Sequence, residues 1–161
     1  MVSVVLLSTC VIAHAQLALS DLLQKSGEIF GQVYIPSIKL KQVVREGVSM
    51  PIINLGIAHW AGSAQPGESG NMVLAGHRTT KTAPFLKIER VQIGDLVLVT
   101  NKDGMVAKYR VYEMFIVDPV KGWSTIYPPD DPEDAILTIF TCHPLYSAIQ
   151  RFVVRARLSS P

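Results

Sequence analysis

Residues 137–144 read Leu-Thr-Ile-Phe-Thr-Cys-His-Pro, a short apolar run that ends in a cysteine, a histidine and a proline. A second apolar run begins at Arg151, nine residues after Cys142. The pattern predicts a strand that carries Cys142 at its C-terminal end, a turn, and a return strand that brings Arg151 back beside it. A third run, Asn71–Ala75, ends in the same way, just before a glycine and His77. We therefore expect three strand ends to place Cys142, His77 and Arg151 around one groove.

The rest of the chain also breaks into short apolar runs separated by turn residues, which is typical of a β-rich domain. An Asp-Gly pair between two of these runs indicates a hairpin. In the last run Arg151 alternates with apolar residues and is expected to point away from the core. About eight strands with one or two short helices predict an all-β fold, a closed eight-stranded barrel preceded by an N-terminal apolar helix. The other expected strands are 33–35, 38–44, 96–100 and 106–117, and the expected helix is 84–90.

Three residues are candidates for binding a substrate. The segment 118–134 holds four prolines and Trp123, and loops of that length in a compact domain tend to be functional. His59 precedes the glycine-rich stretch 62–70, so we expect it in a loop that lines the groove, with simple solvent exposure as the alternative. Thr141 could contribute a hydroxyl near the substrate, although a threonine in a strand needs no such explanation.

Cys142, His77 and Arg151 are the candidates for chemistry. A cysteine with a histidine elsewhere is typical of nucleophilic catalysis, and the alternative is a buried cysteine that packs as a small apolar residue. His77 would act as general acid and then general base, or would be only a hydrogen-bonded residue at a strand end. Arg151 is a permanent cation suited to stabilising an oxyanion, or else an exposed charge like others on its strand.

The neighbours of the catalytic candidates are expected to play lesser parts. Arg78, next to His77, is predicted to be a surface charge or a brace for the loop. His143 follows Cys142, and successive side chains of an extended strand point to opposite sides. We therefore interpret His143 as a turn residue that faces away from the groove.

Composition excludes several classes of protein. With 161 residues, 48% of them hydrophobic and 17% charged, the chain has the size and composition of one folded domain. The net charge of +2, without basic runs interleaved with aromatic residues, argues against nucleic acid as a partner. The four histidines and two cysteines lack the spacing of metal ligands, so we predict no metal site and no cofactor.

The N-terminal segment differs from the rest of the chain. Residues 1–20 contain no Lys, Arg, Asp or Glu, and about 20 apolar residues are needed to cross a bilayer. We predict that residues 1–30 are a truncated membrane anchor or signal region with a linker, and that residues 31–158 form the catalytic domain. The alternative is an amphipathic helix that packs on the domain.

The residues at the predicted groove also carry a family resemblance. The tetrad Thr-Cys-His-Pro at 141–144 with Arg151 downstream, and Gly-His-Arg at 76–78 upstream, resemble the sortases. The stretches 76–85 and 141–151 are most similar to the class E housekeeping branch of actinobacteria, and the likeness in order and spacing covers residues 32–158.

The resemblance implies a β-barrel with its site in an outer groove, and a cysteine transpeptidase with His77, Cys142 and Arg151 as catalytic residues. Its expected partners are an LPXTG-like or LAXTG-like sorting signal, cleaved after threonine through a thioacyl-enzyme, and a peptidoglycan-precursor amine. The expected location is the extracellular face of the cell membrane, reached through the N-terminal segment.

Two other classes of function fit the residues. A cysteine hydrolase would release the acyl group to water instead of to an amine. A non-catalytic extracellular binding module would keep Cys142 buried in its core.

Overall fold

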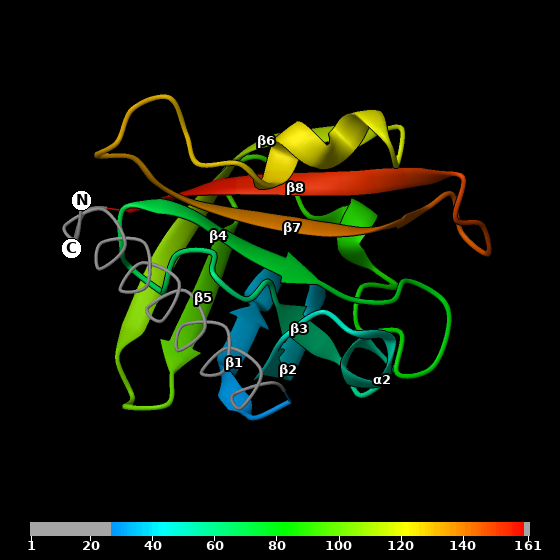
Figure 1. Ribbon diagram of the computed structural model, residues 1–161, viewed down its shortest axis with the longest axis horizontal. Coiled ribbons are helices and arrows are strands. Elements are labelled where there is room, and N and C mark those ends of the chain that lie inside the picture. Colours follow the sequence, from blue (N-terminus) through cyan, green and yellow to red (C-terminus); the bar gives the residue numbers. More distant parts are fainter. Residues whose placement is uncertain (1–26, 160–161) are drawn as a thin grey trace, which may run out of the picture.

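The computed structural model describes residues 27–159, which form eight strands and four short helical segments (Figure 1). The N-terminal apolar segment predicted within residues 1–30 falls almost wholly outside these residues. No helix in the described part of the chain is long and apolar enough to span a bilayer. The strands are β1 (Ile29–Ile35), β2 (Leu40–Glu46), β3 (Ile57–His59), β4 (Gly70–Ala75), β5 (Leu96–Asn101), β6 (Val106–Val117), β7 (Ala135–His143) and β8 (Gln150–Leu158). The helical segments are η1 (Pro36–Ile38), α2 (Met50–Ile53), η2 (Ile88–Arg90) and η3 (Lys121–Ile126).

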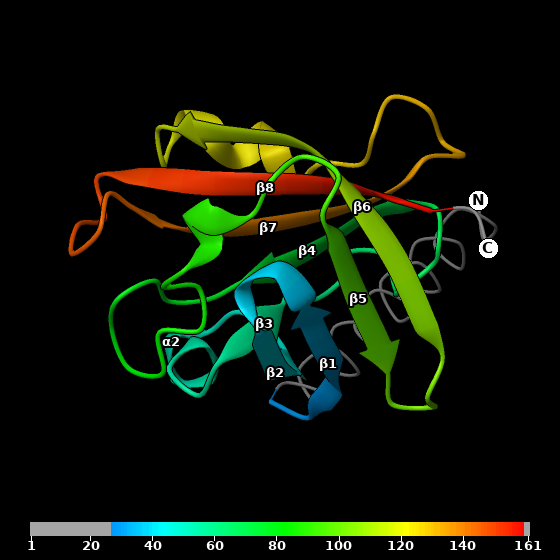
Figure 2. The same ribbon diagram turned by 180° about the vertical axis from the view of Figure 1, so that it is seen from behind.

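The strands close into one barrel in the order β1-β2-β3-β4-β7-β8-β6-β5, seen from two sides in Figures 1 and 2. The pairs β2–β3 and β4–β7 are parallel, and the remaining pairs are antiparallel. The predicted closed, eight-stranded barrel is therefore confirmed, with four short helical segments in the described residues where one or two short helices were predicted.

The helices differ in place from the prediction. The sequence predicts a helix over 84–90, whereas the structure has only the 3₁₀ turn η2 there. The backbone N–H of Phe85 donates to the carbonyl oxygen of His77, eight residues earlier, so this bond ties the start of the segment to the chain after β4 and is not a helical bond. The α-helix is instead α2, where a proline in the first turn is compatible with helix geometry.

The strands β4, β7 and β8 present one apolar face to the barrel core and the other face outward, because side chains alternate along a strand. The inward residues are Met72, Leu74, Leu137, Ile139, Val154 and Ala156. The alternate residues face outward, and they are Asn71, Val73, Ala75, Thr138, Phe140, Cys142, Arg151, Val153 and Arg155. The prediction that Arg151 points away from the core is correct.

The long segment 118–134 crosses this outward face. Its 3₁₀ helix η3 lies along β8 on the outside of the barrel (Figure 1, yellow), and residues of η3 line a pocket with Phe140 of β7 and Val153 of β8. A helical segment within this loop was not expected from the sequence. The outward faces of β7 and β8 thus form the floor of a groove, and η3 forms one wall of it, which we call the η3 wall.

Candidate active site

Cys142, His77 and Arg151 come together at one edge of the barrel. Cys142 lies one residue before the end of β7, and Arg151 lies directly opposite it in the β7–β8 register. His77 follows β4, which runs parallel to β7, so both strands end at the same edge, to the right in Figure 1. All three residues line one pocket. The structure thus brings together the three residues that the sequence singles out for chemistry.

Cys142 is a half-buried free thiol. The residue before it, Thr141, is buried, and its hydroxyl donates to the carbonyl oxygen of Gly76 over 2.7 Å. Because Gly76 precedes His77, this hydrogen bond ties the strand end that carries the thiol to the turn that carries the imidazole. Thr141 lines the pocket as expected, but its hydroxyl is already engaged by the backbone.

Gly76 allows the turn that carries His77 to pack closely on the segment below it. A Cβ atom at this position would lie 2.8 Å from the ring of Phe85, which is fully buried. A larger residue would therefore push the turn, and His77 with it, away from Phe85.

His77 is held by Asn54, which follows α2. The two side chains are 2.8 Å apart between His77 Nε2 and Asn54 Oδ1. Because a carbonyl oxygen only accepts, Nε2 carries the hydrogen and Nδ1 has the free lone pair of the neutral ring. Burial, and after it the positive charge of Lys81, lowers the pKa of His77 from its ordinary value of 6.5. His77 is therefore mainly neutral at neutral pH.

The guanidinium of Arg151 is oriented by the turn between β7 and β8. Its Nη1 donates to the carbonyl oxygens of Ala148 and Gln150, over 2.8 and 2.9 Å. These bonds leave the Nε and Nη2 hydrogens of Arg151 for another acceptor in the pocket. The arrangement suits a cation that binds an oxygen carrying negative charge.

Arg78 is not a surface charge, because only 1% of it is exposed. Its guanidinium forms an ion pair with Glu89 of η2, donates to Nδ1 of His143 over 2.9 Å, and lies 5.9 Å from the ring centroid of Phe152. Arg78 thus braces the turn after β4 against η2, β7 and β8, as the alternative interpretation predicts. The pKa of Glu89 is lowered, chiefly because the hydrogen bond from Arg78 stabilises its carboxylate.

His143 faces this brace and does not line the pocket of Cys142. The prediction that it points away from the groove is correct, but His143 is the last residue of β7 and not a turn residue. Arg78 directly follows His77, and His143 directly follows Cys142. The hydrogen bond between Arg78 and His143 therefore ties the two strand ends together.

A second, largely apolar pocket adjoins the first and shares Phe140 and Arg151 with it. Trp123 of η3 lines this pocket, and its ring packs edge-on against Trp60 with the centroids 5.7 Å apart. Trp123 is half-exposed, so an incoming ligand can reach it. The placement of Trp123 beside the groove agrees with the candidate role in substrate binding.

His59 does not lie in a loop at the groove, and that expectation is wrong. It ends β3, is fully buried, and stacks on Phe30 at a centroid distance of 3.9 Å. Its Nδ1 lies 3.0 Å from a carboxylate oxygen of Glu46 on the neighbouring strand β2. The parallel pairing of β2 and β3, which places Glu46 opposite His59, is a tertiary contact that the glycine-rich stretch downstream does not reveal.

Sequence reasoning also missed Asn54, Trp60 and Phe140 as parts of the site. Phe140 belongs to the predicted strand that carries Cys142, and strand alternation alone places it on the same face as Cys142. Asn54 has no signal in the sequence, because its partner His77 is 23 residues away and only the fold brings them together.

Comparison with known proteins gives a consistent family. A family model of the sortase domain matches residues 33–159. Sortase SrtE1 of Streptomyces coelicolor is 29% identical over 147 residues, which cover 82% of this chain and 41% of the relative. Sortase D of Bacillus subtilis is 29% identical over 133 residues, which cover 81% of this chain and 64% of the relative. The chain spans about half the length of the curated relatives it matches.

Solved structures show the same likeness. A threonine-to-valine mutant of sortase E from Streptomyces avermitilis has 28% sequence identity and a TM-score of 0.74, over 84% of this chain and 90% of that one. The matches to SrtE1 and to sortase E confirm the similarity to class E that the motifs indicate.

Proposed function

Because this chain belongs to the sortase family, we propose that it acts as a cysteine transpeptidase in the pocket where Cys142, His77 and Arg151 meet. The observation that carries this proposal is the convergence of a thiol, an imidazole and a guanidinium from three separate strand ends. Together they supply a nucleophile, a proton carrier and a fixed cation. A half-buried, free Cys142 also disfavours the binding module with a core cysteine.

The first half-reaction forms an acyl-enzyme. The Sγ of Cys142 attacks the peptide carbonyl carbon while the thiol proton passes to Nδ1 of neutral His77. The Nε2–H of His77 remains bonded to Asn54, which makes Nδ1 the nitrogen that exchanges the proton. The free N–H groups of Arg151 stabilise the negative charge on the carbonyl oxygen. The C–N bond then breaks, His77 gives its proton to the leaving amine, and a thioester remains on Cys142.

The second half-reaction transfers the acyl group to an amine. The incoming amine attacks the thioester carbonyl, and His77 accepts a proton from the amine as the new C–N bond forms. The C–S bond breaks, and the proton returns from His77 to the sulfur of Cys142. Arg151 serves the same oxyanion in both half-reactions, so its orientation by Ala148 and Gln150 serves both.

The proposed substrate is an LPXTG-like or LAXTG-like sorting signal, cleaved after threonine, and the proposed acceptor is a peptidoglycan-precursor amine. Membership of the family supports both. The apolar pocket beside Arg151 offers a place for an apolar side chain of the peptide. The uncharged segment 1–20 supports attachment to the extracellular face of the cell membrane.

Hydrolysis is the competing outcome. A cysteine hydrolase would share the first half-reaction, and water would replace the amine in the second. The two reactions differ in the product and not in the residues that form the acyl-enzyme, so product analysis separates them.

The test is mass spectrometry of products from the full chain with LPETG-type and LAETG-type peptides, with and without triglycine or diaminopimelate. We expect an amine-joined product that is absent with the Cys142→Ala variant. Hydrolysed peptide alone, in the presence of either amine, would support the hydrolase. Intact peptide together with a Cys142 that iodoacetamide does not alkylate would contradict both enzymatic functions.

A further inference from the structure

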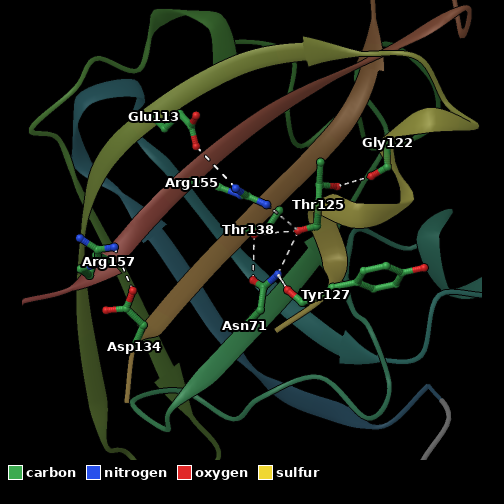
Figure 3. A network of polar contacts seen from close by, with 9 residues as sticks. All are labelled: Asn71, Glu113, Gly122, Thr125, Tyr127, Asp134, Thr138, Arg155 and Arg157. Carbon is green, nitrogen blue, oxygen red and sulfur yellow. Dashed lines mark hydrogen bonds and ion pairs between the residues drawn. The ribbon is translucent and has the colours of Figure 1, made fainter. Parts of the chain in front are cut away.

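Asn71 is a buried amide on the outward face of β4, and it points into the segment that forms the groove wall (Figure 3). Its Nδ2 donates to the carbonyl oxygens of Thr125 and Tyr127, each over 3.0 Å. These two carbonyls lie at the C-terminal end of η3. Both hydrogens of the amide group are therefore used to hold η3.

Thr138 of β7 fixes the amide from the other side. Its hydroxyl donates to Oδ1 of Asn71 over 2.8 Å, and Thr138 is fully buried. In this orientation the amide oxygen accepts from Thr138 and the amide nitrogen donates to both carbonyls, which the flipped amide could not do. The carbonyl oxygen of Thr125 also accepts from Nη2 of Arg155 over 3.4 Å (Figure 3). A carboxylate of the same shape would keep the bond to Thr138 but would face the two carbonyl oxygens without a hydrogen.

The opposite side of η3 faces the groove. Gly122, Trp123, Thr125 and Ile126 line the apolar pocket beside Arg151. Within the segment, the hydroxyl of Thr125 donates to the carbonyl oxygen of Gly122 over 2.6 Å. The wall is thus one compact unit, and on its far side Asn71 joins it to β4 and, through Thr138, to β7.

We propose that Asn71 is a positioning residue that sets the distance of the η3 wall from the catalytic strand ends, and so controls the affinity for the peptide. This inference rests on the proposed transpeptidase function. Thr138 and Cys142 lie four residues apart on the same face of β7, about 13 Å along the strand. Asn71 therefore touches no reacting atom and acts only through the wall that it holds.

The placement predicts which kinetic step Asn71 affects. The strands β4 and β7 carry His77 and Cys142 at one end and hold the wall through Asn71 and Thr138 farther back. Loss of the two bonds from Asn71 would leave the Thr125 carbonyl with the longer bond from Arg155, 3.4 Å, and would let the wall move while the strand ends stay in place. Peptide binding should weaken, and the reactivity of the Cys142 thiol should not change.

The test uses Asn71→Asp, Thr138→Val and a control, all in the full chain. Asn71→Asp is nearly isosteric and removes both donors to η3. Thr138→Val keeps the shape of the side chain and removes only the hydroxyl that orients the amide. Val97→Ala is the control, because Val97 is fully buried in β5 and lines neither pocket.

For Asn71→Asp we expect KM for the sorting peptide to rise about tenfold or more, with kcat within about threefold of the wild-type value. The rate of Cys142 alkylation by iodoacetamide should stay within about twofold. Thr138→Val should also raise KM, but by a smaller factor, and Val97→Ala should leave KM unchanged. In a Trp123→Ala background Asn71→Asp should add little to KM, because both changes act on the same wall.

Unchanged KM in both Asn71→Asp and Thr138→Val would overturn the proposal, as would a fall in kcat and in thiol alkylation with no change in KM. If the wild-type chain does not turn over the peptide, the proposed function fails and hydrogen–deuterium exchange still tests the inference. Amides of residues 121–127 should then exchange at least about tenfold faster in Asn71→Asp, with residues 137–142 unchanged. Equal exchange at 121–127 in variant and wild type would overturn it.

Discussion

The imidazole of His77 depends on two neighbouring side chains, Asn54 and Lys81. Asn54 fixes which ring nitrogen carries the hydrogen, and burial together with Lys81 keeps the ring neutral. Cys142 and Arg151 are placed by strand register, which sets their backbone positions independently of their side chains. Changes at Asn54 and Lys81 therefore affect His77 without moving the other two residues.

Asn54→Ala should lower kcat/KM about tenfold or more, because His77 loses the acceptor that orients it. Asn54→Asp keeps an acceptor at the same place and should retain more activity than Asn54→Ala. The added carboxylate should also raise the pKa of His77 and move the acidic limb of the pH–rate profile to higher pH. Equal losses in the two variants, with the same pH profile, would contradict an orienting role for Asn54.

Lys81→Gln should raise the pKa of His77, because it removes the smaller of the two causes that lower it. Burial remains, so the value should stay below the ordinary 6.5. Attack by Cys142 requires neutral His77, so the acidic limb of the pH–rate profile should move to higher pH in the variant. NMR titration of the His77 ring measures this, with Lys102→Gln as a control on the far hairpin. A pKa that does not rise would show that Lys81 has no effect.

Arg151→Lys should reduce kcat about a hundredfold, because a single ammonium cannot reproduce the donors that Arg151 gives both to the turn and to the oxyanion. Arg157→Lys is the matched control. Arg157 lies on the outward face of the same strand but pairs with Asp134, away from the pocket. Steady-state kinetics on both variants test the assignment, and near wild-type turnover in Arg151→Lys would remove the oxyanion role.

The turn after β4 and the segment 118–134 are both held from outside the groove. The turn is braced by Arg78 between Glu89 and His143, and the segment is held by Asn71 and Thr138. Asn71 and Thr138 line neither pocket, whereas Arg78 also lines the pocket of Cys142. The groove therefore keeps its shape through buried polar contacts.

Glu89→Gln should lower stability at neutral pH by about 1 kcal/mol or less, since Glu89 is 41% exposed and solvent screens its pair with Arg78. The pKa of Glu89 is lower in the folded chain than its ordinary 4.5. The contribution of ionised Glu89 to the free energy of unfolding is therefore complete at pH values above its ordinary pKa of 4.5. It is lost as the pH falls through the lower pKa of the folded chain. Urea denaturation at pH 7 and pH 3 should show a larger difference from wild type at pH 7 than at pH 3. An equal difference at both pH values, or the same effect in Glu133→Gln, would contradict the pair.

Over the whole molecule, local patterns predict the barrel and bring the three residues of the pocket together, and the family resemblance supports their roles. The apolar runs, the hairpin signal and the alternation in the last strand are local, and each corresponds to a strand in the structure. The strands that lead to Cys142 and His77 end at the same edge because they pair in parallel. Both are short apolar runs that end at or just before the functional residue, and this shared pattern indicates the common edge.

What the sequence could not predict depends on contacts between distant residues. Arg78 looks like a surface charge until Glu89 and His143, the latter 65 residues away, surround it. His59 looks like a loop residue until β2 pairs with β3 and brings Glu46 beside it. Asn71 looks like the start of an apolar strand, because its partners in η3 are more than 50 residues downstream. Buried polar residues are the ones whose positions the local pattern does not determine.

The central claim is that acyl transfer passes through a thioester on Cys142, and mass spectrometry of the intact chain tests it most directly. The full chain is incubated with the sorting peptide without an amine, quenched in acid and digested. We predict an adduct on the fragment that contains Cys142, with the mass of the peptide up to threonine. Hydroxylamine should remove this adduct, because it cleaves thioesters. The adduct should persist in Cys10→Ala and be absent in Cys142→Ala. An adduct on another residue, or amine-joined product from Cys142→Ala at the wild-type rate, would contradict the account.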